Sequence, residues 1–328
     1  RSDIVDTNGQ ILAKTVLSTS VGINPNSIID VKKLILKIKL VLPDLDSKVL
    51  EEKIKKKKFF WLRKKIDQEK LKRLQLMGEK SIRFEKQISR VYPHKYLFSH
   101  VIGQIDDANK GISGLEKSLD EKLKTTKNKI RLTLDSEIQF LIRRELIRAE
   151  VFFKNKGSAA ILMNINNGKI LSLISLPDFD LNKRQDIKDK KFINRATKAV
   201  YELGSTFKTF TLAAGFHENV IQPDTPFLNL KKIIFCGKYP IREYDNKIPS
   251  NLTAEEILIR SGNIGSVRIA QKIGVEKYKN FLEKIGILNK IKFDLEEVGI
   301  PLPLKWGKCK LATSSYGHGI TTTLLQLA

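Results

Sequence analysis

The most informative stretch of the sequence is Tyr201-Glu202-Leu203-Gly204-Ser205-Thr206-Phe207-Lys208-Thr209-Phe210. A glycine turn opens there onto an apolar run, and one serine and one lysine stand three residues apart. If Ser205 begins a helix, Lys208 lies one turn further along the same face, so its amine can reach back to the hydroxyl. The residues downstream are apolar on nearly every side, which predicts a buried helix. They are Phe207, Phe210, Leu212, Ala213, Ala214 and Phe216.

This pairing of side chains is suited to acyl transfer, and we interpret the stretch Tyr201 to Phe210 as the site of a covalent acyl-transfer reaction. A serine hydroxyl is a weak nucleophile unless a base takes its proton, and a lysine amine can be that base only when it is uncharged. Lowering a lysine pKa of about 10.4 by roughly three units requires on the order of 4 kcal/mol of preference for the neutral form. Burial among phenylalanines supplies that preference, and the positive end of the helix favours an alkoxide at Ser205. The same spacing also arises by chance in a lysine-rich chain, so the motif needs its context.

The composition is that of a globular protein with an excess of positive charge. The chain has 328 residues, 41% of them hydrophobic, which is enough for two domains. Its 60 basic and 36 acidic residues give a net charge of +24, which favours an anionic partner or surface. The densest basic run, Lys53 to Lys65, has aromatic residues among its lysines and could bind phosphate or an acidic membrane face. Such a run is more often a solvated helix face, and no nucleic-acid module accompanies it.

Metal and nucleotide signatures are absent from the sequence. Cys236 and Cys309 lie far apart without the spacing of metal ligands, and they leave the cellular compartment open. The four histidines are scattered, and neither a phosphate loop nor a dinucleotide fingerprint occurs. We therefore predict no metal, no nucleotide and no other cofactor. No run of about 18 apolar residues and no signal peptide is present, and the last residues, 321–328, are apolar. We expect a piece of a longer protein, cut at both ends.

The first part of the chain predicts a mixed α+β module. Residues 4–13 form a hairpin pattern with Asn8-Gly9 at the turn. Lysine-rich helical patterns cover 31–41, 48–54, 67–77 and 117–129, and a strand pattern covers 82–91. Because no catalytic constellation appears there, we expect a structural or interaction role for the first 130 residues or so.

The second part predicts a sheet that supports a nucleophile. A short strand at 131–135 leads into a helix from 136 to about 153, and strands at 158–165 and 169–175 flank the turn Asn166-Asn167-Gly168. Thr253 and Glu256 have the spacing of a capping box, so a helix starts there and runs through Ile259. Gly262 can end it, which leaves Ser261 and Asn263 at a junction before a helix over 264–273. Read without further context, Ser261 is an ordinary polar residue at a helix end.

Several motifs resemble one known family. Gly204 to Lys208, followed by Ser261-Gly262-Asn263, is similar to the first two signatures of the penicillin-binding proteins. The resemblance spans nearly the whole chain, and the residues that carry it are Asp6-Thr7-Asn8-Gly9, Arg90-Val91-Tyr92-Pro93, His100-Val101-Ile102-Gly103, Gly111-Ile112-Ser113-Gly114-Leu115-Glu116, Asn194-Arg195-Ala196 and Tyr316-Gly317-His318-Gly319-Ile320. They are most like the class B, monofunctional proteins of the septal, cell-division type often called FtsI. The resemblance implies an α+β fold with a pedestal or dimerisation-type domain at 1–130 and an incomplete transpeptidase domain at 131–328, an antiparallel sheet packed with helices.

The resemblance also implies roles for individual residues. Ser205 would attack the penultimate D-alanine carbonyl of a peptidoglycan stem peptide that ends in D-Ala-D-Ala, and Lys208 would accept its proton. Ser261 would relay a proton to the leaving amine, Asn263 would hold the substrate amide while bonding near Lys208, and the Ser205 N–H would form half of an oxyanion hole. An amine of a second stem would form the cross-link, and β-lactams would acylate Ser205.

The same resemblance implies partners and a location. It places the protein at the bacterial inner membrane, with this region on the periplasmic side and the membrane helix outside residues 1–328. The implied partners are division proteins of the membrane, including a glycosyltransferase, and no nucleic acid.

The sequence departs from the family at three points. The third signature, Lys-Thr-Gly or Lys-Ser-Gly, does not occur in residues 1–328. We attribute this to truncation and expect the isolated stretch to be a poor catalyst. Leu203 stands where proline is usual, and Gly262 stands where serine is common; neither change removes a reacting group.

Other functions stay open at this point. The nucleophile helix also suits an elongation-type transpeptidase, a β-lactam sensor or a serine β-lactamase, although the long N-terminal module argues against a lone lactamase domain. From a different class, the run Lys53 to Lys65 could make the protein a nucleic-acid or membrane-surface binder.

Overall fold

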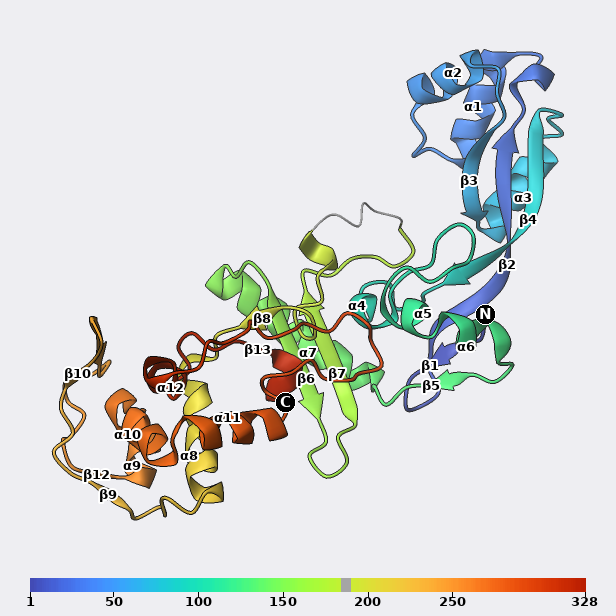
Figure 1. Ribbon diagram of the computed structural model, residues 1–328. Coiled ribbons are helices and arrows are strands. Elements are labelled where there is room, and N and C mark those ends of the chain that lie inside the picture. The colour runs from blue at the N-terminus through green and yellow to red at the C-terminus, as the bar shows by residue number, and fades with distance from the viewer. Residues whose placement is uncertain (184–189) are drawn as a thin grey trace. The chain divides into compact units, whose positions relative to one another are not determined.

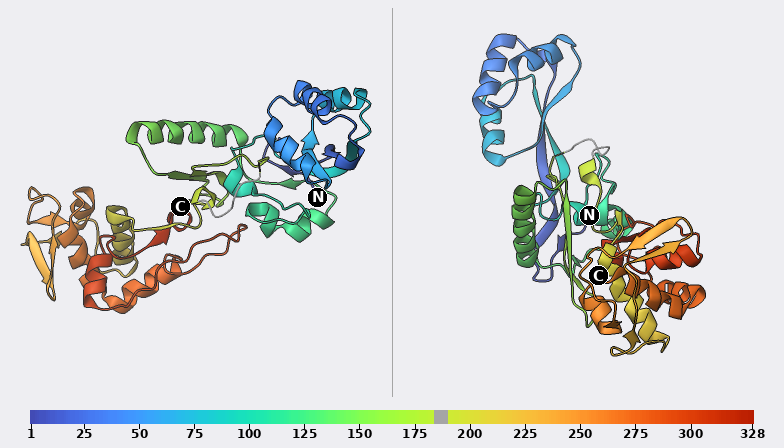
Figure 2. Two further views of the ribbon diagram at one scale, coloured as in Figure 1. Left: turned by 90° about the horizontal axis from the view of Figure 1, so that it is seen from above. Right: turned by 90° about the vertical axis from the view of Figure 1, so that its left-hand side faces the viewer.

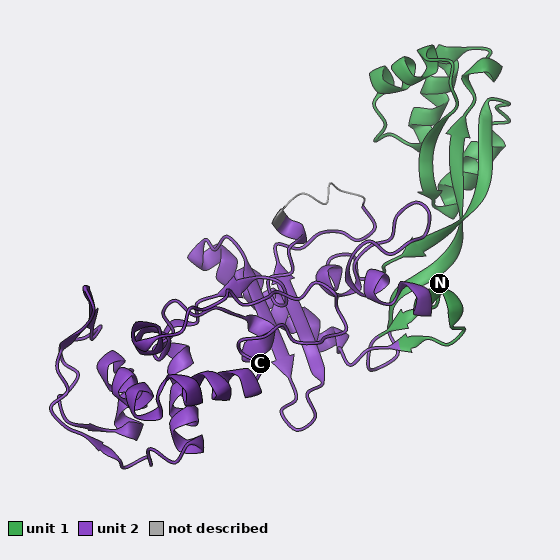
Figure 3. Cartoon of the chain, in the orientation of Figure 1, with its two compact units in different colours: residues 1–5, 11–93, 123–130 green, residues 6–10, 94–122, 131–328 purple. Residues whose placement is uncertain are grey.

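The computed structural model describes residues 1–183 and 190–328, which form two compact units (Figure 3). The first unit comprises residues 1–5, 11–93 and 123–130, and the second comprises 6–10, 94–122 and 131–328. Helices and strands occur in both, so the predicted α+β class is confirmed. The predicted division into domains after residue 130 stays a prediction. Within the described ranges, no helix has the length and apolar character needed to cross a membrane.

The sheet of the first unit is built on one long strand (Figure 1). Its strands are β1 (Ile4–Val5), β2 (Ile11–Ile23), β3 (Phe60–Ile66), β4 (Ile82–Val91) and β5 (Ile130–Arg131), in the order β3-β2-β1-β5 with β4 also paired to β2. The predicted hairpin at 4–13 is confirmed, since β1 pairs antiparallel with β2 and Gly9 takes a φ of +87° at the turn. The strand predicted at 82–91 is confirmed as β4, which pairs with β2 along its whole length.

Three capped helices cover this sheet. They are α1 (Val31–Val41), α2 (Ser47–Lys55) and α3 (Gln68–Leu76), and each begins after an aspartate that accepts backbone N–H groups of the first turn: Asp30, Asp46 and Asp67. The three predicted helices are therefore confirmed. The reading of residues 53–65 as one helix face is wrong, because α2 ends at Lys55 and β3 starts at Phe60. Phe60, Leu62 and Ile66 instead pack on the core of this unit.

The helix predicted over residues 117–129 is also wrong in its extent. The structure has two short helices, α5 (Gly114–Ser118) and α6 (Asp120–Thr125), which follow α4 (Ser99–Ile102). Leu119 leaves helical geometry at the end of α5. Asp120 then starts α6, where its charge suits the helix N-terminus, and its carboxylate accepts the Gly111 N–H at 2.7 Å.

The sheet of the second unit is a hairpin backed by a long helix (Figures 1 and 2). Strands β6 (Ser158–Met163) and β7 (Ile170–Leu176) pair antiparallel, and α7 (Ser136–Phe153) packs on β7, so both predictions are confirmed. Buried Gln139 fixes the helix to the strand, since it donates to the Leu173 carbonyl and accepts from the Leu173 N–H and the Ser172 hydroxyl. The strand predicted at 131–135 is shorter and ends at Arg131.

A helical lobe completes the second unit. It contains the 3-10 helix η3 (Gly204–Phe207) and the helices α8 (Lys208–His217), α9 (Ala254–Ile259), α10 (Asn263–Ile273), α11 (Val275–Lys284), α12 (Lys308–Ser314) and α13 (Leu324–Leu327). The short elements of this unit are η2 (Lys190–Phe192), β8 (Val200–Tyr201), β9 (Pro226–Phe227), β10 (Ile233–Cys236), β11 (Tyr239–Arg242), β12 (Leu252–Thr253) and β13 (Thr322–Thr323). The first unit has a 3-10 helix of its own, η1 (Pro25–Ser27). Helices α8 to α12 share one apolar core. The prediction of a buried helix with apolar residues on nearly every side is confirmed for Leu212 and Ala214 of α8, but Phe216, which it counts among the buried residues, is 38% exposed.

A disulfide links two elements of this lobe, so neither of its cysteines is a free thiol. Cys236 at the end of β10 is bonded to Cys309 in α12, with 5.4 Å between their Cα atoms. The bond closes a loop of 73 residues, for which the loss of unfolded-chain entropy is worth about 4 kcal/mol in the chain-entropy model. It therefore fixes the β10–β11 hairpin against α12.

Candidate active site

Ser205 and Lys208 lie within one tight turn. Gly204 takes a φ of +57°, which a residue with a side chain rarely adopts, and the chain then enters η3 before α8 begins at Lys208. In a 3-10 turn, residues i and i+3 eclipse each other, whereas an α-helix would offset them. The result is a distance of 3.0 Å between Lys208 Nζ and Ser205 Oγ. Ser205 is exposed while Lys208 is 0% exposed, so a nucleophile that a substrate can reach sits above a buried amine.

The amine of Lys208 has three oxygen partners. Besides Ser205 Oγ, Nζ lies 2.9 Å from Ser261 Oγ and 2.5 Å from the Ser261 carbonyl oxygen. A neutral amine has two N–H donors and one lone pair. It can therefore donate to both Ser261 oxygens while it accepts the Ser205 hydroxyl proton, which is the arrangement that a general base requires.

Burial makes the neutral form accessible. Desolvation lowers the pKa of Lys208 to about 8, and the negative charge of Glu243 opposes that shift. With a pKa of about 8, about a tenth of Lys208 is neutral at pH 7 and about nine tenths at pH 9. The buried base therefore gains its function as the pH rises.

We expect acylation of Ser205 to rise about tenfold between pH 7 and pH 9, with a midpoint near pH 8. The sign follows from the protonation state, since only deprotonated Lys208 can accept a proton. The measurement is the second-order rate constant for labelling of the full-length protein by a fluorescent penicillin, taken at half-unit pH steps. A flat profile over this range, with the reagent stable, contradicts Lys208 as the base.

Ser261 reaches Lys208 from the junction between α9 and α10. The capping box predicted for Thr253 and Glu256 is confirmed at the start of α9. The prediction that Gly262 ends this helix is wrong, since Gly262 has a φ of −66° and Ser261 itself takes the left-handed φ of +55°. That conformation is costly for serine, and the hydrogen bonds from Lys208 to its carbonyl and hydroxyl help to hold it.

Asn263 is the first residue of α10, next to this junction. Its side-chain amide donates to the Arg242 carbonyl at 2.9 Å, while Lys208 bonds the two serines. The structure thus brings Ser205, Lys208 and Ser261 into direct contact, and it places Asn263 beside them on the next helix.

The loop 316–319 packs against the nucleophile turn. A Cβ added to Gly317 would lie 1.9 Å from the Gly204 carbonyl oxygen, and Gly317 has a φ of +82°, so only glycine fits there. Next to it, His318 Nδ1 lies 3.4 Å from a Glu202 carboxylate oxygen. The loop therefore fixes the turn that carries Ser205.

Glu243 belongs to the site and was missed by the sequence reasoning. Its carboxylate accepts the backbone N–H groups of Asn263 and Ile264, at 2.7 and 2.9 Å. Nothing in the local sequence signals this role, because it depends on the β10–β11 hairpin lying against the start of α10.

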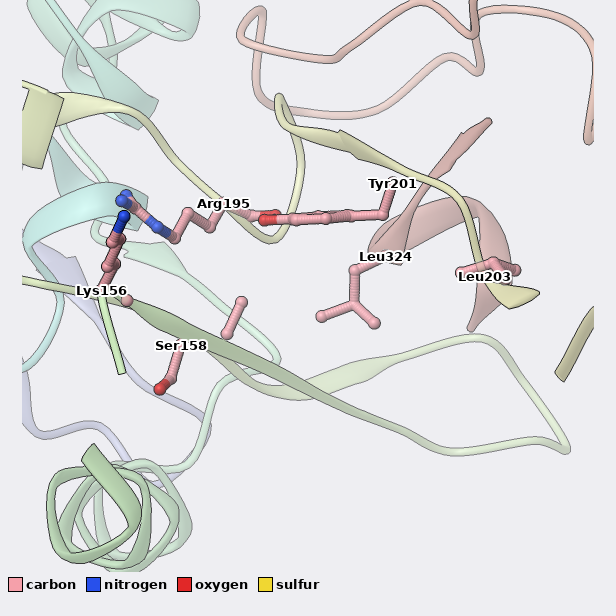
Figure 4. A pocket seen from close by; sticks show the side chains of 8 residues that line it. Lys156, Ser158, Arg195, Tyr201, Leu203 and Leu324 are labelled. Carbon is pink, nitrogen blue, oxygen red and sulfur yellow. The ribbon is translucent and has the colours of Figure 1, made fainter. Parts of the chain in front are cut away.

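A pocket lies beside the nucleophile turn (Figure 4). It has a volume of about 350 Å³, and its lining residues are Lys156, Gly157, Ser158, Ala159, Arg195, Tyr201, Leu203 and Leu324. Lys156 and Arg195 both line this pocket, and the Tyr201 hydroxyl donates to the Arg195 carbonyl. The lining includes Leu203 but not Ser205 or Lys208, so the reacting groups lie outside this pocket.

Metal ligands do not gather anywhere in residues 1–183 and 190–328, since no group of three or more histidine, cysteine or acidic side chains is placed to hold an ion.

Comparison with known families matches both parts of the chain. A family model described as the penicillin binding protein transpeptidase domain matches residues 158–328, just over half of the chain. A second, described as the penicillin-binding protein dimerisation domain, matches residues 1–148. The expected order, with a dimerisation-type module before a transpeptidase domain, is confirmed.

Individual relatives agree with these matches. A probable peptidoglycan D,D-transpeptidase FtsI of Caulobacter vibrioides is 29% identical over 333 residues, covering 100% of this chain and 56% of the relative. Stage V sporulation protein D of Bacillus subtilis is 30% identical over 368 residues, which cover 99% of this chain and 56% of the relative. Peptidoglycan D,D-transpeptidase FtsI of Escherichia coli K12 is 24% identical over 371 residues, which cover 100% of this chain and 61% of the relative. The chain thus spans less than two thirds of the length of these relatives.

Proposed function

This chain belongs to the penicillin-binding proteins, as a class B protein of the FtsI type, and from that premise we propose that it is part of a serine D,D-transpeptidase that cross-links peptidoglycan stem peptides. The observation that carries the proposal is the contact of Lys208 Nζ with both Ser205 Oγ and Ser261 Oγ, at 3.0 and 2.9 Å. We also propose that residues 1–130 form the pedestal domain and residues 131–328 the transpeptidase part.

Acylation is the first half of the reaction. Ser205 Oγ attacks the carbonyl carbon of the penultimate D-alanine, and neutral Lys208 takes the hydroxyl proton. The Ser205 N–H lies in the first turn of a helix, where backbone donors lack partners within the helix, so it can stabilise the developing oxyanion. A second donor would come from a strand with the Lys-Thr-Gly signature, which residues 1–328 do not contain. For that reason we expect residues 1–328 alone to acylate poorly.

Release of the leaving group and transfer complete the reaction. Protonated Lys208 passes its proton to Ser261 Oγ, which passes one to the nitrogen of the departing D-alanine as the peptide bond breaks. An amine of a second stem peptide then attacks the ester carbonyl and gives one of its protons to neutral Lys208. Lys208 passes this proton to Ser205 Oγ as the ester bond breaks. A new peptide bond replaces the broken one, so the reaction needs no external energy source. Asn263, at the start of α10, is proposed to bind the substrate amide.

Cell division is the setting that the relatives favour, because two of the three described above carry the name FtsI. We propose that the full-length protein works at the inner membrane, with residues 1–328 on the periplasmic side. Membrane proteins of the division machinery, including a glycosyltransferase, are the proposed partners, and β-lactams are proposed to acylate Ser205. The disulfide between Cys236 and Cys309 supports an oxidising compartment for this region.

The direct test is the reaction itself in the full-length protein. Given a stem peptide that ends in D-Ala-D-Ala and an acceptor amine, we expect free D-alanine and cross-linked dimer in equal amounts. A peptide that ends in D-Ala-L-Ala is the matched control and should release nothing. Release of D-alanine without dimer at saturating acceptor would mean that water is the acceptor, and the protein would then be a carboxypeptidase. No release with either peptide contradicts the proposal.

A further inference from the structure

Glu243 occupies an unusual place among the charged residues of the site. It is half-buried directly after β11, and its backbone N–H donates to the Lys232 carbonyl at 3.1 Å. The hairpin that presents it is fixed to α12 by the bond between Cys236 and Cys309. The carboxylate is therefore held by a rigid support rather than by a free loop.

The Glu243 carboxylate supplies the hydrogen-bond acceptor that the start of α10 lacks. Backbone N–H groups in the first turn of a helix need partners, which usually come from the side chain of the N-cap residue. The N-cap of α10 is Gly262, which has no side chain to offer. Glu243 accepts the N–H groups of Asn263 and Ile264 with its two oxygens, at 2.7 and 2.9 Å. A residue 20 positions earlier in the chain thus caps the helix.

The capped turn is the one that holds Ser261. Ser261 stands two residues before Asn263 in a left-handed conformation that serine seldom adopts. Its hydroxyl and its carbonyl both face Lys208 Nζ. If the start of α10 shifted, this strained residue could relax, and the two Ser261 oxygens would move away from the amine together. The position of the base thus depends on a carboxylate that touches neither Ser205 nor Lys208 in any described hydrogen bond.

We propose that Glu243 is a positioning residue for the acyl transfer: by capping α10 from the β10–β11 hairpin, it holds Ser261 in the conformation that Lys208 needs. This inference rests on the proposed function. It assigns Glu243 no contact with the substrate. Its effect is on the rate of the chemical step and not on the initial binding of the substrate analogue.

The test uses the full-length protein and a fluorescent penicillin at a series of concentrations. The saturation curve gives an apparent dissociation constant and a limiting acylation rate constant, and the endpoint gives the fraction of active protein. For Glu243→Gln, which keeps the shape but replaces one acceptor with a donor, we expect the limiting rate constant to fall at least about tenfold at pH 9. At this pH Lys208 is mostly neutral with or without the charge of Glu243, so the influence of that charge on the pKa of Lys208 does not mask the loss. The apparent dissociation constant should stay within about threefold of the original.

Two further variants separate positioning from loss of structure. Glu276→Gln removes the same charge from the first turn of the neighbouring helix α11 and should leave both constants unchanged. Gly262→Ser, combined with Glu243→Gln, supplies an N-cap hydroxyl at a residue whose φ of −66° suits serine, and an added Cβ there meets nothing closer than 3.7 Å. We expect this double variant to recover part of the lost rate. A purely structural defect would lower the labelled endpoint and leave the rate constant of the remaining protein unchanged.

The outcomes separate this inference from the proposed function. If the unaltered protein is labelled at Ser205 and Glu243→Gln reacts with the original rate constant, the positioning role is refuted and the function stands. If Glu243→Gln gives a smaller labelled fraction but an unchanged acylation rate constant, the positioning role is also refuted. If the unaltered protein is not labelled at Ser205, the proposed function fails, and this inference fails with it.

Discussion

Covalent labelling by a fluorescent penicillin is expected to disappear when Ser205 is replaced by alanine in the full-length protein. The lactam ring opens only if an oxygen attacks its carbonyl carbon, and Ser205 Oγ is the exposed hydroxyl next to the buried amine. Loss of the nucleophile in a serine enzyme lowers the rate by on the order of 10⁴-fold or more, so no labelled band should remain after a long incubation. The measurement is in-gel fluorescence after denaturation, which reports only covalent adducts.

Ser250→Ala is the matched control for this experiment. Ser250 is an exposed serine of the same lobe, and only its backbone carbonyl takes part in a described hydrogen bond. That variant should be labelled at the original rate. Persistent labelling of Ser205→Ala, at a rate within tenfold of the original, would show that another residue is the nucleophile.

Replacing Lys208 should have the second largest effect. We expect Lys208→Ala and Lys208→Arg to acylate at least about 10³-fold more slowly, because neither can accept the Ser205 proton at neutral pH. The arginine variant is the more informative of the two, since it keeps a cation at the site and removes only the capacity to act as a base. Rates of labelling by the fluorescent penicillin measure the effect.

The fold should survive the change to alanine. Lys208 is fully buried, and with a pKa of about 8 its amine is mostly charged at pH 7, so burial of that charge costs free energy that the alanine variant no longer has to offset. Thermal unfolding should therefore stay cooperative. Lys277→Ala, which removes an exposed lysine of α11, is the control and should acylate normally. If Lys208→Arg retains more than a tenth of the original rate, a different group is the base.

Several predictions that rested on local signals are confirmed. The aspartates that cap α1, α2 and α3 are local signals that the helix predictions did not use. Asn8-Gly9 predicted a hairpin, and Thr253 with Glu256 predicted the capping box at the start of α9. A second box of the same kind, formed by Thr323 and Gln326 at the start of α13, is equally local and was overlooked. These features depend only on interactions between residues a few positions apart, so they can be predicted from a short stretch of sequence.

Other parts were set by tertiary packing that short stretches do not encode. The run from Lys53 to Lys65 looked like a solvated helix face, but its apolar residues complete the core of the first unit from β3. Ser261 rather than Gly262 took the left-handed conformation, because Lys208 binds both of its oxygens from another helix. The capping of α10 by Glu243 likewise joins residues that only the folded hairpin brings together.

The spacing of Ser205 and Lys208 predicted the contact between their side chains, but the backbone that produces this contact differs from the predicted one. The prediction assumed an α-helix that starts at Ser205, whereas the structure has a 3-10 turn that ends where α8 begins. The tighter turn stacks the two side chains directly. The depth of the lysine, which lowers its pKa, could be expected from the phenylalanines around it, although its partners on Ser261 could not.

The central claim is that the Ser205 hydroxyl carries the acyl group of the substrate. The measurement that tests it most directly is a peptide-resolved mass spectrum of the unaltered full-length protein, quenched in acid during turnover of a stem peptide that ends in D-Ala-D-Ala. The account predicts that the added mass, equal to the stem peptide less one D-alanine, is found on Ser205 and on no other residue. An adduct located on any other side chain, or turnover without an adduct under conditions that trap one on a known serine transpeptidase, contradicts it.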